Sequence, residues 1–408
     1  MSKNMLLFSI NQCWKKHTPL KINFCDRLHI SSFRELGSLN NKLLVGEMMF
    51  AAVMETVPTD QLVIADDVTL RDVGPGDVRL KVAHSGVCHS DLSGMNGTIP
   101  TQPGTVLGHE GAGVVLEVGE GVSHVAEGDH VIIAFSPPCG ACPNCTGRHQ
   151  PNLCMNGLMA MGVNQQFRQG DRVIGSFCGC GTFAEETIVP SIATVKIDND
   201  IPLDIAALIG CGVTTGVGAA LNTAKVTPGS SVLVVGAGGV GIAAIQGARI
   251  AGASEIVAVD LHEGKLERAK AFGATHGVTP EDVPAALAEV TSGEGFDFTL
   301  ECIGLASTMR QSFDLTRRGG TCCIVGVGRP DEMFELSAFE MFFSEKVLIG
   351  SMYGSADVRT DFNRFLSLYK SGKLDLDGMI SRRIKIDEVN DALSSLGDAD
   401  VIRQVIDF

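Results

Sequence analysis

The sequence is poor in aromatic residues and in positive charge, and it lacks a long uninterrupted apolar run. It has one tryptophan and two tyrosines in 408 residues, and 47 Asp and Glu outnumber 32 Lys and Arg. The net charge of −15 argues against a general affinity for nucleic acid. No apolar run reaches the roughly 18 residues that a membrane-spanning helix needs. We therefore expect a soluble protein without a membrane partner.

Other residue types are plentiful. Hydrophobic residues make up 45% of the chain and glycine occurs 48 times, a profile typical of α/β proteins. The length favours two or three domains. The thirteen cysteines are an odd number in a long chain with no clear secretory signal. This pattern indicates a reducing compartment such as the cytoplasm, where clustered cysteines more often bind metal than form disulfides.

The N-terminal stretch differs from the rest. Residues 1–47 contain seven Lys or Arg against three Asp or Glu, and they include the only tryptophan, Trp14. Three interpretations are open: a targeting segment, an extra ordered arm, or translated upstream sequence with the true start at Met48, Met49 or Met54. We favour the last, and we expect this atypical extension to be dispensable for activity.

Strand patterns recur after residue 61. "VRLKVAHSGV" alternates apolar and polar residues, and "GAGVVLEVGEGV" and "GDHVIIAFSPP" follow with glycine-rich turns. Short β-branched runs at this spacing predict an all-β, barrel-like unit.

The pattern changes near residue 213. "SVLVVGAGGVGIAAIQGARIAGASEIVAVD" indicates a buried strand, a glycine turn, an amphipathic helix and a second buried strand. "FDFTLECIG" and "GGTCCIVGVG" continue the alternation, so we predict a doubly wound parallel sheet. After about residue 354, "VRTDFNRFLSLYKSGKL" is helical, and the chain ends on the strand-like "VIRQVIDF".

Four cysteines cluster in and after "CGACPNC", at Cys139, Cys142, Cys145 and Cys154. Disulfides, an iron–sulfur cluster, a zinc site and a redox switch are all compatible with this spacing alone. The inferred reducing compartment argues against disulfides.

A second motif carries nucleotide-binding chemistry. The residues Gly236, Ala237, Gly238, Gly239, Val240 and Gly241 fit G-x-G-x-x-G after a strand and before a helix. Backbone N–H groups there can bind a pyrophosphate. Asp260 ends the next strand, where its carboxylate can bond both ribose hydroxyls and repel a 2′-phosphate. We therefore predict NAD rather than NADP, with Lys265 as a second ribose contact.

Three further residues suit a catalytic metal. Cys88 in "GVCHSDL", His109 in "GHEGAG" and Cys211 in "GCGVTTG" supply two thiolates and one imidazole. This is the three-ligand set of a catalytic zinc site that keeps one position for water or substrate. Each residue alone could equally be an ordinary buried side chain.

Together the motifs resemble the zinc-dependent alcohol dehydrogenases of the medium-chain dehydrogenase/reductase family, over about residues 50–408. The resemblance implies an α/β fold with a β-rich GroES-like catalytic domain at 48–212, which includes a structural zinc lobe. It implies a Rossmann NAD-binding domain at 213–354 and a C-terminal segment at 355–408 that returns to the catalytic domain. It also implies an NAD-dependent alcohol dehydrogenase that assembles as a homodimer or homotetramer.

The resemblance assigns two zinc ions per chain. Cys139, Cys142, Cys145 and Cys154 match the family's closed structural site, although the gap before Cys154 is slightly longer than usual. A catalytic zinc falls to Cys88, His109 and Cys211.

The resemblance also implies roles around the catalytic zinc. Ser90 would accept the alcohol's proton, Asp91 would orient His109, and Glu110 would lie near the metal. The remaining matched positions are cofactor contacts at His89, Thr215, Val325 and Arg403, and a substrate-pocket wall at Phe135.

Two departures affect the details. Many family members carry a histidine three residues after the relay hydroxyl, but this chain has Ser93, which cannot act as a base near neutral pH. The branch that oxidises S-hydroxymethyl thiol adducts carries acidic residues after the "CxSD" stretch, and "SGMNGTIP" has none. We therefore expect ordinary primary or secondary alcohols as substrates. The thiol-adduct activity is the first alternative, and a non-catalytic zinc- and nucleotide-binding protein is the alternative from another class.

Overall fold

The computed structural model describes residues 47–408, so the predictions for the N-terminal extension lie outside the described part of the chain. The first described strands form a small closed barrel. Its strands, in order, are β1 (Met49–Met54), β2 (Val63–Leu70), β7 (Phe167–Gln169), β8 (Arg172–Ser176) and β4 (Thr105–Val106).

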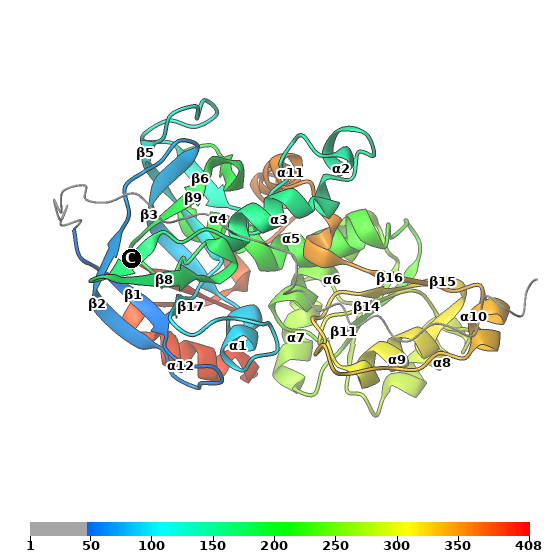
Figure 1. The fold of residues 1–408 in the computed structure, drawn as a ribbon. Coiled ribbons are helices and arrows are strands. Elements are labelled where there is room, and N and C mark those ends of the chain that lie inside the picture. The colour runs from blue at the N-terminus through cyan, green and yellow to red at the C-terminus, as the bar shows by residue number, and fades with distance from the viewer. Residues whose placement is uncertain (1–46) are drawn as a thin grey trace, which may run out of the picture. The chain divides into compact units, whose positions relative to one another are not determined.

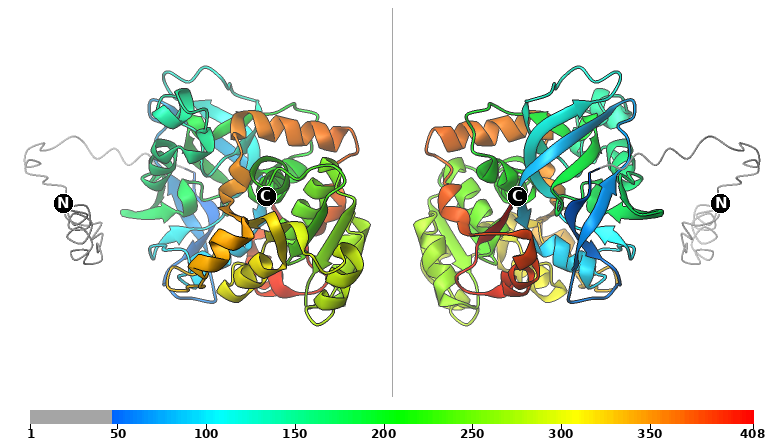
Figure 2. Two further views of the ribbon diagram at one scale, coloured as in Figure 1. Left: turned by 90° about the vertical axis from the view of Figure 1, so that its right-hand side faces the viewer. Right: turned by 90° about the vertical axis from the view of Figure 1, so that its left-hand side faces the viewer.

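A larger mixed sheet lies beside it and collects strands from both ends of the described chain. Its order is β10 (Thr194–Lys196), β6 (His130–Ile133), β5 (Glu110–Val118), β3 (Asp77–Val87), β18 (Arg403–Asp407) and β17 (Ile380–Ile384), with β9 (Glu186–Pro190) on β3. The C-terminal strand β18 pairs antiparallel with β3. Figures 1 and 2 show the red C-terminal elements beside blue strands from the start of the described chain.

The third sheet is wholly parallel. Its order is β13 (His276–Val278), β12 (Glu255–Val259), β11 (Ser231–Val235), β14 (Phe296–Glu301), β15 (Thr316–Ile324) and β16 (Val347–Gly350). This is the predicted doubly wound sheet, and the predicted strands at 231–235 and 255–259 are confirmed.

Both faces of this sheet are covered. Val232 and Val234 of β11 belong to the apolar cluster that includes helix α6 (Gly239–Ala251). Leu233 and Val235 belong to a second cluster with helix α8 (Val283–Thr291). Because neither face is exposed, "SVLVV" is a continuous apolar run rather than an alternating one. The other principal helices are α1 (His89–Met95), α2 (Pro143–Thr146), α3 (Met155–Gly162), α7 (Glu263–Ala271), α9 (Ala306–Leu315), α10 (Ala338–Ser344), α11 (Val358–Lys370) and α12 (Val389–Ser394).

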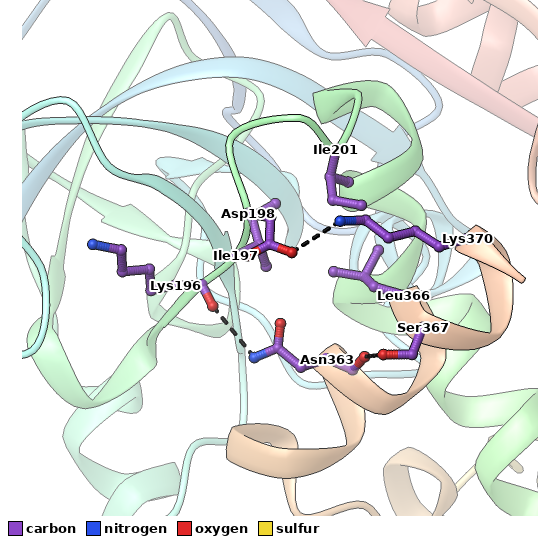
Figure 3. Close-up of a pocket in the computed structure, with 8 residues that line it drawn as sticks. All are labelled: Lys196, Ile197, Asp198, Ile201, Asn363, Leu366, Ser367 and Lys370. Carbon is purple, nitrogen blue, oxygen red and sulfur yellow. Dashed lines mark hydrogen bonds and ion pairs between the residues drawn. The ribbon is translucent and has the colours of Figure 1, made fainter.

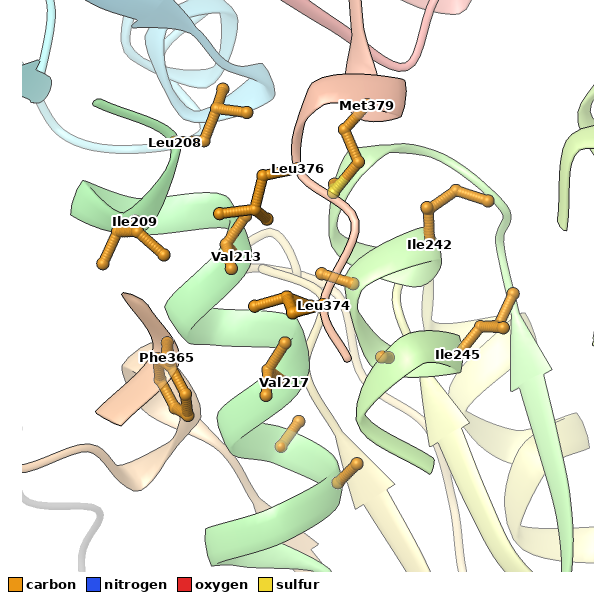
Figure 4. Packing of buried hydrophobic residues seen from close by; sticks show 14 of the residues in the cluster. Leu208, Ile209, Val213, Val217, Ile242, Ile245, Phe365, Leu374, Leu376 and Met379 are labelled. Carbon is orange, nitrogen blue, oxygen red and sulfur yellow. The ribbon is translucent and has the colours of Figure 1, made fainter. Parts of the chain in front are cut away.

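A long apolar helical stretch, Leu203–Thr223, precedes the parallel sheet. It comprises α4 (Leu203–Leu208), a π-helical turn η4 (Ile209–Val213), α5 (Thr214–Gly218) and a second π-helical turn η5 (Ala219–Thr223). Its length and mean hydropathy of 1.6 would allow it to span a membrane. This was not predicted from the sequence, because polar residues interrupt the apolar run. However, 83% of the apolar window is buried inside the fold. Figure 4 shows its side chains packed towards α6 and the 374–379 segment, as expected for a core helix.

Candidate functional site

Four residues from three separate parts of the sequence meet near the end of strand β3. Ligand atoms of Cys88, His109, Glu110 and Cys211 all lie within 4.8 Å of one another, and all four residues are buried. Cys88 caps helix α1, Glu110 begins β5, and Cys211 lies in the π-helical turn η4. The predicted set of metal ligands is thus brought together.

The carboxylate of Asp91 organises two of these residues. Its Oδ1 lies 3.1 Å from His109 Nδ1, and its Oδ2 accepts a hydrogen bond from the backbone N–H of Cys88 at 3.2 Å. His109 Nε2 is buried and has no hydrogen-bond partner among the described residues. A carboxylate on one ring nitrogen and an unpaired second nitrogen is the usual arrangement of a metal-binding histidine.

The charges in the cluster also suit a cation. Burial lowers the pKa of His109, but Asp91 and the sulfur of Cys88 raise it by more, so the net pKa is well above the ordinary value. A hydrogen bond from Cys211 lowers the pKa of Cys88 well below the ordinary value. Two sulfurs and an imidazole are a donor set that zinc prefers, and the residues therefore fit this metal.

Glu110 is engaged elsewhere. One carboxylate oxygen accepts the backbone N–H of Gly212 at 3.2 Å, and the other forms a buried salt bridge with Arg403. Glu110 therefore lies beside the three other donors with both oxygens bonded.

The four clustered cysteines also converge. Cys142 Sγ lies 3.6 Å from Cys145 Sγ and 3.7 Å from Cys154 Sγ. A tetrahedral zinc with bonds of about 2.3 Å requires sulfur–sulfur distances of about 3.8 Å, so the geometry fits. Backbone N–H groups of Ala141 and Cys142 lower the pKa of Cys139 to about 6, which favours the thiolate. The short helix α2 between these ligands buries none of its residues, so the lobe has little core of its own.

The glycine motif forms the turn between β11 and α6. Gly236 has φ +95°, a left-handed conformation that favours glycine. A Cβ on Gly241 would lie 1.8 Å from the carbonyl oxygen of Gly236, whereas a Cβ on Gly238 would meet nothing within 4 Å. Asp260 follows β12, and the ammonium of Lys265 donates to the carbonyl of Gly397 at 3.0 Å.

Arg403 connects this motif with the buried cluster. A Cβ on Gly239 would lie 2.5 Å from Arg403 Cδ, while the guanidinium pairs with Glu110. Arg403 Nε is buried and has no partner among the described residues. An unpaired donor beside a glycine turn fits a pyrophosphate contact.

The other predicted residues lie on α1, on α5 and directly after β15. His89 is exposed and Ser90 half-buried in the first turn of α1, and the Ser90 N–H lies 3.5 Å from Cys88 Sγ. Thr215 follows Cys211 by about one helical turn, and Val325 is buried directly after β15.

Two aromatic rings contact His109, and a third stacks on one of them. The predicted wall residue Phe135 lies edge-on to the imidazole with centroids 5.7 Å apart, and Phe177 does the same at 5.5 Å. Tyr353 stacks on Phe135 at 4.1 Å. Neither Phe177 nor Tyr353 was predicted from the sequence to belong to the site. The one available signal for Tyr353 was the scarcity of tyrosine.

A cavity of about 510 Å³ lies away from all of these residues, between the 196–201 segment and α11. Figure 3 shows Lys370 directed at Asp198. Lys370 also bonds Asp200, so two carboxylates compensate its charge. No predicted site residue lines this cavity.

Comparison with known proteins adds independent evidence. Residues 74–199 match the alcohol dehydrogenase GroES-like domain, and residues 239–371 match the zinc-binding dehydrogenase family. The chain is 37% identical over 360 residues to the class-3 alcohol dehydrogenase of Cereibacter sphaeroides, covering 84% of this chain and 95% of that protein. It is 39% identical over 354 residues to the S-(hydroxymethyl)glutathione dehydrogenase of Photobacterium damsela subsp. piscicida, covering 83% and 95%.

A solved structure supports the same grouping. Benzyl alcohol dehydrogenase from Acinetobacter calcoaceticus has a TM-score of 0.80 and 30% identity, covering 88% of this chain and 99% of that chain. The GroES-like and parallel-sheet architecture expected from the sequence is confirmed by this likeness and by the domain matches.

Proposed function

The chain belongs to the zinc-dependent alcohol dehydrogenases of the medium-chain dehydrogenase/reductase family, and from this premise we propose that it oxidises ordinary primary or secondary alcohols with NAD. The products are aldehydes or ketones, and the reaction is reversible. One observation carries the proposal: the donors of Cys88, His109 and Cys211 converge, and the Nε2 atom of His109 has no hydrogen-bond partner within residues 47–408. Ser90 is near them, with its N–H 3.5 Å from Cys88 Sγ.

Zinc is the catalytic cofactor of this family. A zinc ion held by Cys88, His109 and Cys211 would lower the pKa of a bound alcohol, much as it lowers that of bound water from about 16 to about 7. Cys139, Cys142, Cys145 and Cys154 would hold the structural ion.

The chain's own side chains supply positioning and proton transfer. Asp91 fixes the ring of His109, and Ser90, two residues after Cys88, accepts the alcohol's proton. The aromatic rings of Phe135 and Phe177 limit access of water to the reacting carbon.

The cofactor is oriented by the glycine motif and its neighbours. Backbone N–H groups at the start of α6, together with Arg403 and His89, bind the pyrophosphate. Asp260 and Lys265 bind the ribose, and Thr215 and Val325 lie along the nicotinamide.

Ordinary alcohols are favoured over a glutathione adduct by the residues after Asp91. The stretch 93–100 contains no charged side chain to recognise a peptide-like, charged substrate. Oxidation of S-(hydroxymethyl)glutathione is the second candidate function, because some relatives are named S-(hydroxymethyl)glutathione dehydrogenase.

We also propose a homodimer formed by pairing of the edge strand β16. This strand has no neighbour on its outer side among the described residues, and Val347 and Ile349 on it are exposed. Phe339 and Phe342 of the adjacent helix α10 are 70% and 79% exposed. An apolar edge of this kind is protected when it pairs with a second copy.

A substrate panel tests the proposed reaction. Alcohols and aldehydes are assayed with NAD or NADP, following absorbance of the reduced cofactor, and formaldehyde is assayed with and without glutathione. Turnover of simple alcohols with NAD supports the proposal. Activity confined to formaldehyde with glutathione would replace it with the second candidate, and no turnover at all would favour a non-catalytic protein.

A further inference from the structure

The short turn Met352–Ser355, which follows β16, has an unusual backbone. Tyr353 has φ +53°, Gly354 has φ +63° and Ser355 has φ +49°, so three successive residues are left-handed. A bulky aromatic residue rarely adopts this conformation unless its surroundings require it. The structure shows what those surroundings are.

Tyr353 contacts the neighbours of two candidate metal ligands, Cys211 and His109. Its hydroxyl donates a hydrogen bond to the carbonyl of Gly210, the residue before the ligand Cys211. Its ring stacks on Phe135 at 4.1 Å with an interplanar angle of 29°. Phe135 in turn lies edge-on against the ligand His109.

The rest of the turn contacts the helical stretch Leu203–Thr223, which carries Cys211. A Cβ on Gly354 would lie 2.2 Å from the carbonyl oxygen of Thr214, so the two backbones are in direct contact. Asn222 donates to the carbonyl of Gly354 at 3.3 Å, and Thr223 Oγ1 lies 2.8 Å from Ser351 Oγ.

The other end of the turn is anchored in the parallel sheet. The N–H of Ser351 bonds the carbonyl of Ile324 in β15 at 2.8 Å. The nucleotide-binding sheet thus reaches the helix that carries Cys211 through this turn, and Tyr353 is its contact nearest to the metal ligands.

We propose that Tyr353 is a positioning residue for the catalytic metal centre. Its hydroxyl holds the turn that carries Cys211, and its ring holds Phe135 against His109. A phenylalanine would keep the ring stack but would leave the buried Gly210 carbonyl without this donor. The inference rests on the proposed zinc-dependent function, because it requires a metal at Cys88, His109 and Cys211.

The test compares Tyr353→Phe with wild-type protein in the full-length chain, with both metal sites loaded with Co²⁺. Mutation of a residue that supports a metal ligand typically lowers metal affinity by about 10- to 100-fold. We expect chelator-driven release of Co²⁺ from the Cys88–His109–Cys211 site to accelerate by at least about tenfold, with a shifted ligand-field band. Release from the four-cysteine site should not change. Tyr369→Phe, which removes the other tyrosine hydroxyl, is the matched control and should match wild type at both sites.

The outcomes are distinguishable. Unchanged release and an unchanged spectrum at the Cys88 site would overturn the role of Tyr353. Equal acceleration at both sites would indicate general loosening of the fold and would overturn it as well. If wild-type protein binds no cobalt at the Cys88 site, the proposed function itself fails, and the role of Tyr353 fails with it.

Discussion

The carboxylate of Asp260 accepts a hydrogen bond from the backbone N–H of Ala237 at 2.9 Å. The residue predicted to select the cofactor is therefore held against the glycine motif. Its other oxygen accepts the N–H of His262 at 3.1 Å.

This position leads to the first prediction. Asp260→Ser should raise the use of NADP and weaken that of NAD, because it removes the negative charge that repels a 2′-phosphate. A hydrogen bond to a charged group contributes about 1.5–3 kcal/mol, so kcat/KM for NAD should fall about tenfold or more. Steady-state kinetics with both cofactors measure this, and NAD turnover by wild type is the reference. A wild-type preference for NADP would contradict the assignment.

The parallel sheet was predictable because its central strands β11 and β12 are buried on both faces. The run "SVLVV" is apolar throughout, and glycines mark the turn that follows it. The role of the Leu203–Thr223 helix was harder to predict. Its interruptions by polar residues hid its length, and its π-helical turns depend on tertiary packing around Cys211 rather than on local propensity.

The second prediction concerns proton transfer. Ser90→Ala should lower kcat by about 10²–10⁴, the usual effect of losing positioned proton transfer. Metal content should not change, because the hydroxyl is not a ligand. Ser93 lies on the same helix and provides the matched control, since Ser93→Ala should have little effect. Full activity of Ser90→Ala would show that the alcohol loses its proton by another route.

A third prediction extends this test to the missing histidine. Ser93→His places an imidazole with a pKa near 6.5 where many relatives have one. It should speed alcohol oxidation mainly between about pH 6 and 8, where hydroxide is scarce. A solvent isotope effect on wild type first shows whether proton release limits the rate rather than cofactor departure. If that effect is present and the variant's pH profile matches wild type, the relay does not end at this position.

The candidate site was predictable only in part. Ligand residues such as Cys88 and His109 lie in short motifs with characteristic neighbours. Tyr353 has no such motif, because its contacts depend on how a turn from one sheet packs on a helix from another. The salt bridge between Glu110 and Arg403 likewise joins residues almost 300 positions apart.

The fourth prediction is metal content. Elemental analysis of metal-replete protein should give close to two zinc ions per chain, and Cys145→Ser should reduce this to about one. Because the lobe around Cys142 buries little apolar surface, metal loss should expose it to proteolysis. Cys302 lies in neither cluster, so Cys302→Ser should retain two ions. Metal content near zero, or iron with visible charge-transfer bands, would contradict both assignments.

The last prediction tests the edge strand. Sedimentation should show a dimer of the wild-type protein, and Val347→Lys combined with Ile349→Lys should give a monomer. Lysines on an edge strand disfavour its pairing with another strand, because the charges would be buried at the new interface. Val173 is similarly exposed, but on a barrel strand, so Val173→Lys is the matched control and should remain dimeric.

Metal content of the double variant should equal that of wild type, since neither position contacts a metal ligand. A monomeric wild-type protein, or a double variant that still dimerises, would show that β16 is not the interface. Every predicted metal ligand and cofactor contact lies within one chain. An intact monomeric variant would therefore reveal whether turnover needs the second subunit.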